Sequence, residues 1–222
     1  MTRQNINYRD REEATQELLK NMPIEAMKKD DWTVVSTSIN GLIVASIIAS
    51  KLDAEIDILL TSKIYAPENS DCAIAIISET KELVINNELV KAFDIDKEYI
   101  YNMAEKNLQD DILQFSSMHK PENYKLEYNN KNILFVDEGV NTNLTLMASI
   151  KTAIKLGAKS ISVAVPVVPD AVVEDIEQVV DDFYFADKIE HFTSIDVYYD
   201  EFEDLNFKEI KNILNKKQKK EI

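Results

Sequence analysis

The sequence contains little glycine, proline, cysteine and arginine, and each shortage excludes something. Its 222 residues include 3 Gly, 5 Pro and 1 Cys, with no low-complexity run, so nothing marks a linker and we predict one domain over residues 1–222. The single cysteine, Cys72, cannot form an internal disulfide and fits a reducing compartment. Arginine occurs only at Arg3, Arg9 and Arg11, so the rest of the chain cannot supply bidentate arginine clamps for phosphate.

Long apolar runs are missing as well. The longest, Leu42 to Ala49, is far shorter than the roughly 20 residues of a membrane-spanning helix, and Met1 to Lys20 is too polar for a signal peptide. We therefore expect a cytoplasmic protein that does not bind membranes. The 40 acidic and 25 basic residues give a formal charge of −15, which repels nucleic acid over most of the surface. Nucleic acid is therefore not an expected partner.

Apolar stretches alternate with helical patterns along the chain, and 45% of the residues are hydrophobic. Strands are predicted at Trp32–Val35, Ile56–Leu60, Cys72–Ser78, Glu82–Ile85, Ile133–Val136 and Ser160–Val168, and helices at Asn7–Met22, Leu42–Leu52, Asp96–Phe115 (with Asp96 as N-cap), Leu146–Ile154 (ending at Gly157), after Asp170, and at Phe207–Asn215. Continuously apolar strands separated by helices indicate an α/β fold, with a mainly parallel sheet and flanking helices.

Ligands bind such sheets at the carboxyl ends of the strands. Three polar loops are predicted there, at residues 36–41, 61–71 and 137–145. The last begins with two adjacent acids, Asp137 and Glu138, whose side chains cannot both face the core. They could accept hydrogen bonds from sugar hydroxyls and hold Mg²⁺, directly or through water. They could equally be ordinary acids of a strand-to-helix turn, stabilised by the helix dipole.

The stretch after the acids opens a helix. Its backbone N–H groups have no partner within the helix and can converge on an anion, and Thr142 and Thr145 can add hydroxyl donors. Simple N-capping by Asn or Thr, which needs no ligand, is the alternative. The loop concerned contains Gly139, Val140, Asn141, Thr142, Asn143, Leu144 and Thr145.

Ile133 to Thr145, ILFVDEGVNTNLT, resembles the phosphoribosyl pyrophosphate-binding motif of type I phosphoribosyltransferases: an apolar strand, two acids, a short linker and Thr-Gly-x-Thr. Four further stretches resemble a branch of predicted phosphoribosyltransferases with unassigned substrate: YRDREEA from Tyr8, KIYAPEN from Lys63, VAVPVVP from Val163 and YYDEF from Tyr198. These matches occur in the same order as in that branch, so the resemblance covers nearly the whole chain.

The resemblance implies a core parallel sheet with a small hood, which the N-terminal and C-terminal segments would form. It implies transfer of phosphoribose between phosphoribosyl pyrophosphate and a nitrogen base, a role in nucleotide metabolism and Mg²⁺ as cofactor. A homodimer is compatible with this sequence, but no residue pattern identifies the oligomeric state. Asp137 and Glu138 would bind the ribose hydroxyls, residues 140–145 the 5′-phosphate, and Lys63 the pyrophosphate. The pyrophosphate loop would be Ser38, Ile39, Asn40 and Gly41, and the base would lie near Pro166–Pro169.

Several positions depart from the family pattern. Asn143 replaces a glycine of the phosphate loop, where its side chain would intrude and where a positive φ would be needed. The loop Thr37–Gly41 lacks an arginine and one glycine, and the arginines expected between Asp111 and Lys120 are missing. Only Lys63 and Lys120 remain as cations for pyrophosphate, whose departure needs positive charge or metal.

Three functions are compatible with this sequence. The first is an active phosphoribosyltransferase. The second is a degenerate member that binds a phosphorylated ribose or nucleotide in a regulatory or scaffolding role. The third is a protein that keeps only the fold and associates through its acidic surface. No residue pattern identifies the acceptor base.

Overall fold

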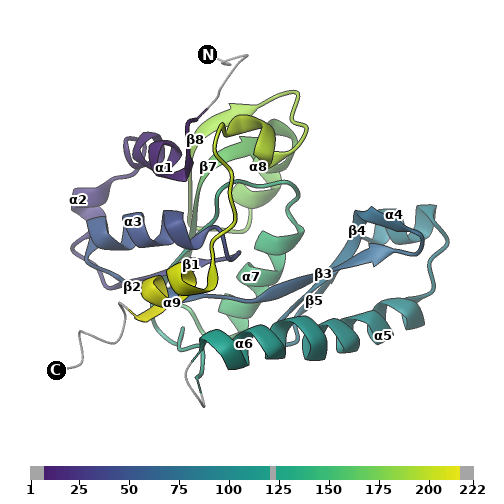
Figure 1. Ribbon diagram of the computed structural model, residues 1–222. Helices are drawn as coiled ribbons and strands as arrows, with labels where there is room; N and C mark the ends of the chain where they lie inside the picture. Colours follow the sequence, from purple (N-terminus) through teal and green to yellow (C-terminus); the bar gives the residue numbers. More distant parts are fainter. Residues whose placement is uncertain (1–7, 121–123, 216–222) are drawn as a thin grey trace.

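The computed structural model describes residues 8–120 and 124–215; Asn7, the first residue of the predicted N-terminal helix, lies outside these ranges. Its centre is a five-stranded sheet in the order β2-β1-β6-β7-β8 (Figure 1). All four strand pairs are parallel. The strands are β1 (Trp32–Ser36), β2 (Glu55–Ile58), β6 (Asn132–Val136), β7 (Ser160–Pro169) and β8 (Asp182–Ile189).

Helices cover both faces of this sheet, which explains why its central strands are apolar throughout. Alternate side chains of β6 point to opposite sides: Leu134 packs in the cluster that contains Leu42 of α3 (Leu42–Leu52), and Phe135 packs with Leu146 of α7 (Leu144–Lys155). Helices α1 (Arg11–Leu19) and α8 (Asp170–Glu177) complete the two layers (Figure 1). The predicted α/β fold with a mainly parallel sheet and flanking helices is confirmed.

A second, antiparallel sheet forms an arm beside the first (Figure 1). It contains β3 (Thr61–Ala66), β4 (Asn69–Ser78) and β5 (Leu83–Ile85), with α4 (Asn87–Ala92) and α5 (Lys97–Asn107) alongside. The prediction of a loop over residues 61–71 was therefore wrong, whereas the two strands predicted after it are present as β4 and β5. The residues of β3 alternate between buried and exposed, the pattern of a strand covered on one face only.

One long helical stretch runs from the arm back to the central sheet. Asp96 caps its start, as predicted, by accepting a hydrogen bond from the Glu98 N–H at 2.9 Å. After α5 the chain forms a π-helix, η1 (Leu108–Leu113), and then α6 (Gln114–His119), so the helical stretch extends beyond the predicted end at Phe115. Such π-helical turns are rare in proteins, and those that occur frequently lie at functional sites.

The start of the described chain pairs with the segment that follows η2. Near the N-terminus, the Tyr8 N–H donates to the Tyr198 carbonyl, and the Asp200 N–H donates to the Tyr8 carbonyl, both at 2.8 Å. The remaining elements are the short helix α2 (Ile24–Met27), the 3₁₀-helix η2 (Ile195–Tyr198) and α9 (Phe207–Asn215), which contacts α3. Figure 1 shows the last part of the chain crossing from the end of β8 towards α3.

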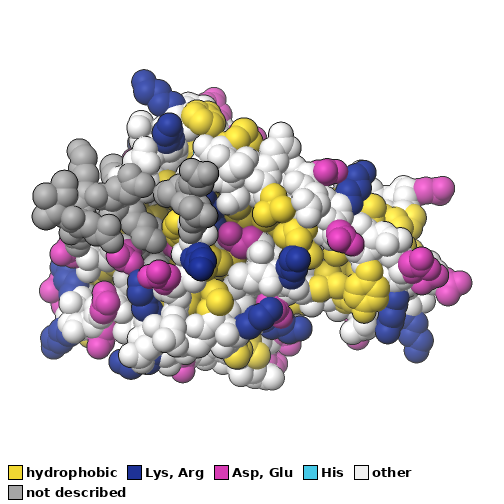
Figure 2. Space-filling view, turned by 90° about the horizontal axis from the view of Figure 1, so that it is seen from below, with side chains coloured by type: hydrophobic (Ala, Val, Ile, Leu, Met, Phe, Trp, Pro, Cys, Tyr) yellow, Lys and Arg dark blue, Asp and Glu magenta, His cyan; other side chains and the backbone are white. Residues whose placement is uncertain are grey.

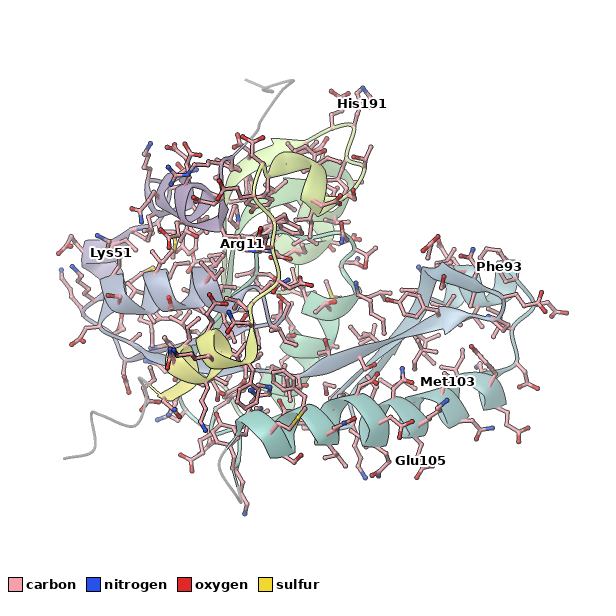
Figure 3. All side chains as sticks on the ribbon, viewed as in Figure 1. Arg11, Lys51, Phe93, Met103, Glu105 and His191 are labelled. Carbon is pink, nitrogen blue, oxygen red and sulfur yellow. The ribbon has the colours of Figure 1, made fainter. Side chains whose placement is uncertain are left out.

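The surface is mixed in character. Tyr65, Phe93 and Tyr101 of the arm are exposed; Figure 2 shows apolar side chains there among acidic and basic ones, and Figure 3 marks Phe93 near the end of the arm. Throughout residues 8–120 and 124–215, no helix has both the length and the apolar character that a bilayer crossing requires.

Candidate functional site

A cleft of about 490 Å³ lies at the carboxyl ends of β1 and β6, where the arm joins the central sheet. It brings together ten of the predicted site residues: Ser38, Ile39, Asn40, Lys63, Asp137, Glu138, Val140, Asn141, Thr142 and Thr145. Three others, Gly41, Asn143 and Leu144, stand beside the cleft without lining it. The prediction missed eight lining residues: Thr37, Thr61, Ser62, Tyr65, Asp111, Gly139, Leu146 and Ile195.

Asp137 lies at the bottom of this site, directly after β6. Thr37 and Ser38 directly follow the adjacent strand β1, and their hydroxyls donate to the two Asp137 carboxylate oxygens, each at 2.5 Å. The Glu138 N–H donates a third hydrogen bond at 2.8 Å. Burial raises the pKa of Asp137, and the two hydroxyl hydrogen bonds oppose that rise because they favour the charged form. A carboxylate has about four acceptor positions, so about one remains for a ligand hydroxyl.

Gly41 makes room for this arrangement. A Cβ atom at residue 41 would lie 2.8 Å from an Asp137 carboxylate oxygen and 2.7 Å from the Ser36 hydroxyl, closer than such contacts allow. The Gly41 N–H also donates to the Ser38 hydroxyl at 2.9 Å. The predicted pyrophosphate loop is therefore folded onto the acid pair, and its one glycine is required by contact with Asp137.

The side-chain amide of Asn40 forms hydrogen bonds with the C-terminal part of the chain. Its Nδ2 donates to the Asp204 carboxylate at 2.7 Å, and its Oδ1 accepts from the Leu205 N–H at 3.1 Å. These partners were not predicted, because they lie more than 160 residues further along the chain. Asn40 can thus contact a ligand only with the part of its amide that these two bonds leave free.

Glu138 forms a buried ion pair with Arg11, which lies at the start of α1 (Figure 3). The two side chains are 11% and 4% exposed. Burial, together with the neighbouring Asp137, raises the pKa of Glu138 to about 7, while the hydrogen bond and charge of Arg11 act in the opposite direction. The Tyr199 hydroxyl donates to the Glu138 carbonyl at 2.5 Å. The sequence signal for Arg11 was its place in the matched YRDREEA stretch, but its partner was not identifiable.

The candidate phosphate loop leads into α7. Thr142 and Thr145 line the cleft, and the first N–H groups of α7 lack acceptors within the helix, as at any helix start. Asn143 has φ −72° and ψ −7°, so no positive φ is needed at this position. Its Nδ2 donates to the Asp175 carboxylate at 3.1 Å. The expected intrusion of the Asn143 side chain into the loop was therefore wrong.

The opposite wall of the cleft carries one cation and one acid. Lys63 is exposed on β3, and its ammonium forms no ion pair with any residue that the structure describes. Asp111 projects from the π-helix η1, where it accepts a hydrogen bond from the Ser62 hydroxyl at 2.6 Å. Lys120, the second cation expected for pyrophosphate, is instead buried in an ion pair with Glu79 at 2.7 Å. Among the described residues that line the cleft, Lys63 is thus the one cation.

The acid pair could contribute to a Mg²⁺ site only in part. In the described portion of the chain, no group of three or more His, Cys, Asp or Glu side chains could hold a metal ion. One Glu138 oxygen is bound to Arg11, and both Asp137 oxygens accept hydroxyl hydrogen bonds. These residues therefore fit a Mg²⁺ ion that takes most of its six oxygen ligands from substrate phosphates and water.

Comparison with known proteins gives both fold and sequence relatives. No family model matches the sequence. The protein TT1426 of Thermus thermophilus superposes with a TM-score of 0.72 over 95% of this chain and 99% of its own, at 22% identity. Two Mycobacterium tuberculosis proteins, named "Putative phosphoribosyl transferase MT0597" and "Putative phosphoribosyl transferase Rv0571c", are each 26% identical over 133 residues. The resemblance to type I phosphoribosyltransferases is confirmed.

The phosphoribosyltransferase-like chain matches only part of those relatives. The aligned stretch covers 60% of this chain and 30% of each Mycobacterium protein. A hypoxanthine phosphoribosyltransferase of Staphylococcus aureus is a more distant structural neighbour, with a TM-score of 0.47 and 13% identity over 81% of this chain and 75% of its own.

Proposed function

We propose that the cleft binds a phosphorylated ribose and that the protein transfers phosphoribose between phosphoribosyl pyrophosphate and a nitrogen base. The observation that carries this proposal is the placement of three unlike groups around one cleft. The start of α7, with Thr142 and Thr145, and the Asp137 carboxylate line the same cleft as Lys63, which stands on the opposite wall. In this proposal the first would face a phosphate and the second ribose hydroxyls. The proposal includes a hood formed by the N-terminal and C-terminal segments, and a cytoplasmic location.

The residues of the cleft have separable roles in such a reaction. Backbone N–H groups and the two threonine hydroxyls would hold the 5′-phosphate, and the free acceptor position of Asp137 would bind a ribose hydroxyl. No side chain is placed as a covalent nucleophile in this scheme. Displacement at the anomeric carbon would be dissociative, and Lys63 would stabilise the departing pyrophosphate. Mg²⁺, carried in by the substrate, would neutralise part of the pyrophosphate charge.

Titration calorimetry with ribose 5-phosphate and with phosphoribosyl pyrophosphate, each with and without Mg²⁺, tests the proposal. We expect Asp137→Asn to weaken both ligands, because the amide NH₂ in place of one oxygen removes acceptor positions. Asp170→Asn is the matched control, since Asp170 is an exposed acid paired with Lys188 outside the cleft. Ribose 5-phosphate binding that is absent, or equally strong in both variants, would contradict the assigned site.

A second candidate function is binding of a phosphorylated ribose without turnover. The small positive charge on the proposed pyrophosphate side favours it. That wall offers Lys63 together with Asp111, and Arg11 is occupied by Glu138. If this candidate holds, phosphoribosyl pyrophosphate should bind no more tightly than ribose 5-phosphate, and no pyrophosphate should be released with any nucleobase tested. Tighter, Mg²⁺-dependent binding of the pyrophosphate compound together with turnover would favour the transferase.

A further inference from the structure

The part of the chain between η2 and α9 contacts both loops of the cleft. This C-terminal segment (Tyr199–Leu205) contains no helix and only the single bridge that pairs Tyr199 with Tyr8. The N–H groups of residues 202–204 donate to no acceptor within the described chain. Backbone hydrogen bonds from the Asp200 N–H to Tyr8 and from the Glu201 N–H to Arg9 hold the first half of the segment. The side-chain contacts that hold residues 202–205 include bonds to Asn40 of the cleft and to its neighbour Arg11.

The first set of contacts joins the segment to Glu138. The Arg11 guanidinium pairs with the Glu138 carboxylate through Nε and donates through Nη1 to the Glu203 carbonyl at 2.9 Å. It also lies 4.0 Å from the ring centroid of Phe202, a favourable cation–π distance. The Tyr199 hydroxyl adds a direct bond to the Glu138 carbonyl. Glu138, which lies two residues before the candidate phosphate loop, is thus held in place by Tyr199 and by Arg11, which itself contacts the C-terminal segment.

The second set joins the segment to the predicted pyrophosphate loop. The amide of Asn40 donates a hydrogen bond to the Asp204 carboxylate and accepts one from the Leu205 N–H. Residue 203 is therefore bound to Arg11, the ion-pair partner of Glu138, and residues 204 and 205 are bound to Asn40 of the predicted pyrophosphate loop. A ligand that displaces either Glu138 or Asn40 must move the segment or break these bonds.

Arg11 cannot adjust independently of its neighbours. The residue is 4% exposed, and its Nη2 atom is buried with no hydrogen-bond partner in the part of the chain that the structure describes. Removing Nε or Nη1 from its acceptor would leave a further buried donor unsatisfied, which is costly. A movement of the Glu138 carboxylate is therefore transmitted to Phe202 and Glu203.

We propose that Arg11 is a positioning residue that couples occupancy of the cleft to the C-terminal segment. This inference rests on the proposed ribose phosphate site. A ligand hydroxyl bound to the free Glu138 oxygen would fix the carboxylate against Arg11, and the segment would become better ordered at Glu203 and at Asn40. The segment is then part of the site, although none of its residues lines the cleft.

Hydrogen exchange of the full chain, measured by mass spectrometry on peptides covering residues 199–205, tests this coupling. In the wild type, saturating ribose 5-phosphate should slow exchange of these peptides several-fold. Arg11→Lys keeps the charge but loses the planar fork that makes both bonds. We expect it to speed exchange of the segment without ligand and to abolish the ligand-dependent slowing.

Arg9→Lys is the matched control, because the Arg9 side chain is 66% exposed and pairs with the adjacent Asp10. It should respond to ligand as the wild type does. A purely structural role of Arg11 would change ligand-free exchange but leave the ligand-dependent slowing intact, and that result would overturn the coupling. Should Arg11→Lys fail to fold, Tyr199→Phe removes the direct bond to Glu138 and should reduce the slowing.

Failure of the proposed function gives a different pattern. Ribose 5-phosphate would then produce no heat in calorimetry with the wild type, and the coupling would be judged from exchange without ligand. Faster exchange in both residues 199–205 and residues 37–41 of Arg11→Lys, compared with Arg9→Lys, would support the coupling. Unchanged exchange of the loop 37–41 would overturn it.

Discussion

The buried acid pair predicts an unusual dependence of stability on pH, and Glu138 offers the clearest test. The pKa of Glu138 is raised in the folded protein from an ordinary 4.5 to about 7, so between these values the folded chain binds more protons than the unfolded chain. The contribution of Glu138 to stability is therefore fully present below about pH 4.5 and is lost as the pH rises through 7. At about 1.4 kcal/mol per pH unit, the change over this window is about 3 kcal/mol.

Glu138→Gln isolates this contribution, because glutamine does not titrate and has nearly the same shape. The free energy of unfolding would be measured by urea denaturation from about pH 5 to about pH 8 for both chains. We expect the wild type to lose stability relative to Glu138→Gln as the pH rises. Glu12→Gln, at an exposed position of α1, is the control and should show no comparable divergence from the wild type.

Two outcomes would contradict this reasoning. A wild-type minus Glu138→Gln difference that does not change with pH would mean that Arg11 cancels the effects of burial and Asp137. A difference of opposite sign, with the wild type gaining stability as the pH rises, would mean that the ion pair outweighs both. In either case Glu138 would be a permanently charged partner of Arg11 and not a group that titrates near neutrality.

Three further predictions concern substitutions of Gly41, Lys120 and Asn143. Gly41→Ala places a methyl group against Asp137, and we expect a loss of about 1–3 kcal/mol in urea unfolding together with weaker ribose 5-phosphate binding. Lys120→Met leaves Glu79 buried without its partner and should cost about 3–5 kcal/mol of unfolding free energy, with unchanged ligand affinity in calorimetry. Asn143→Gly restores the family residue, yet should change stability by only a few tenths of a kcal/mol and leave phosphate affinity unaltered.

Local patterns sufficed for elements whose signals lie within a few residues. The bounds of α3 and α9, the cap at Asp96 and the αL residue Gly157, with φ 77°, agree with the sequence prediction. In each case the deciding interaction, either an apolar stripe or a cap, involves neighbouring residues. The carboxyl end of β6 was also located correctly, because its apolar run ends abruptly at Asp137.

Edge and antiparallel strands were harder to predict, because the strands are half-exposed and the sequence does not indicate which sheet they join. Strand β8 carries charged residues such as Asp187 and Lys188 among its aromatic ones, a composition that suits an edge strand but resembles a loop. Likewise, β3 follows β2 after two residues and belongs to a different sheet. The Arg11–Glu138 pair spans 127 residues, and no local signal indicates that such residues meet.

The structure changes which departures from the family pattern matter. The replacement of glycine by Asn143 alters the most recognisable motif, yet this residue has ordinary helical φ and ψ and bonds away from the cleft. The loss of arginine has a larger consequence. Lys120 is buried against Glu79, and Lys63 is the one cation among the described residues that line the cleft, on the proposed pyrophosphate side. Because pyrophosphate departure needs stabilising charge in the transition state, turnover should depend on substrate-borne Mg²⁺ far more than ribose 5-phosphate binding does.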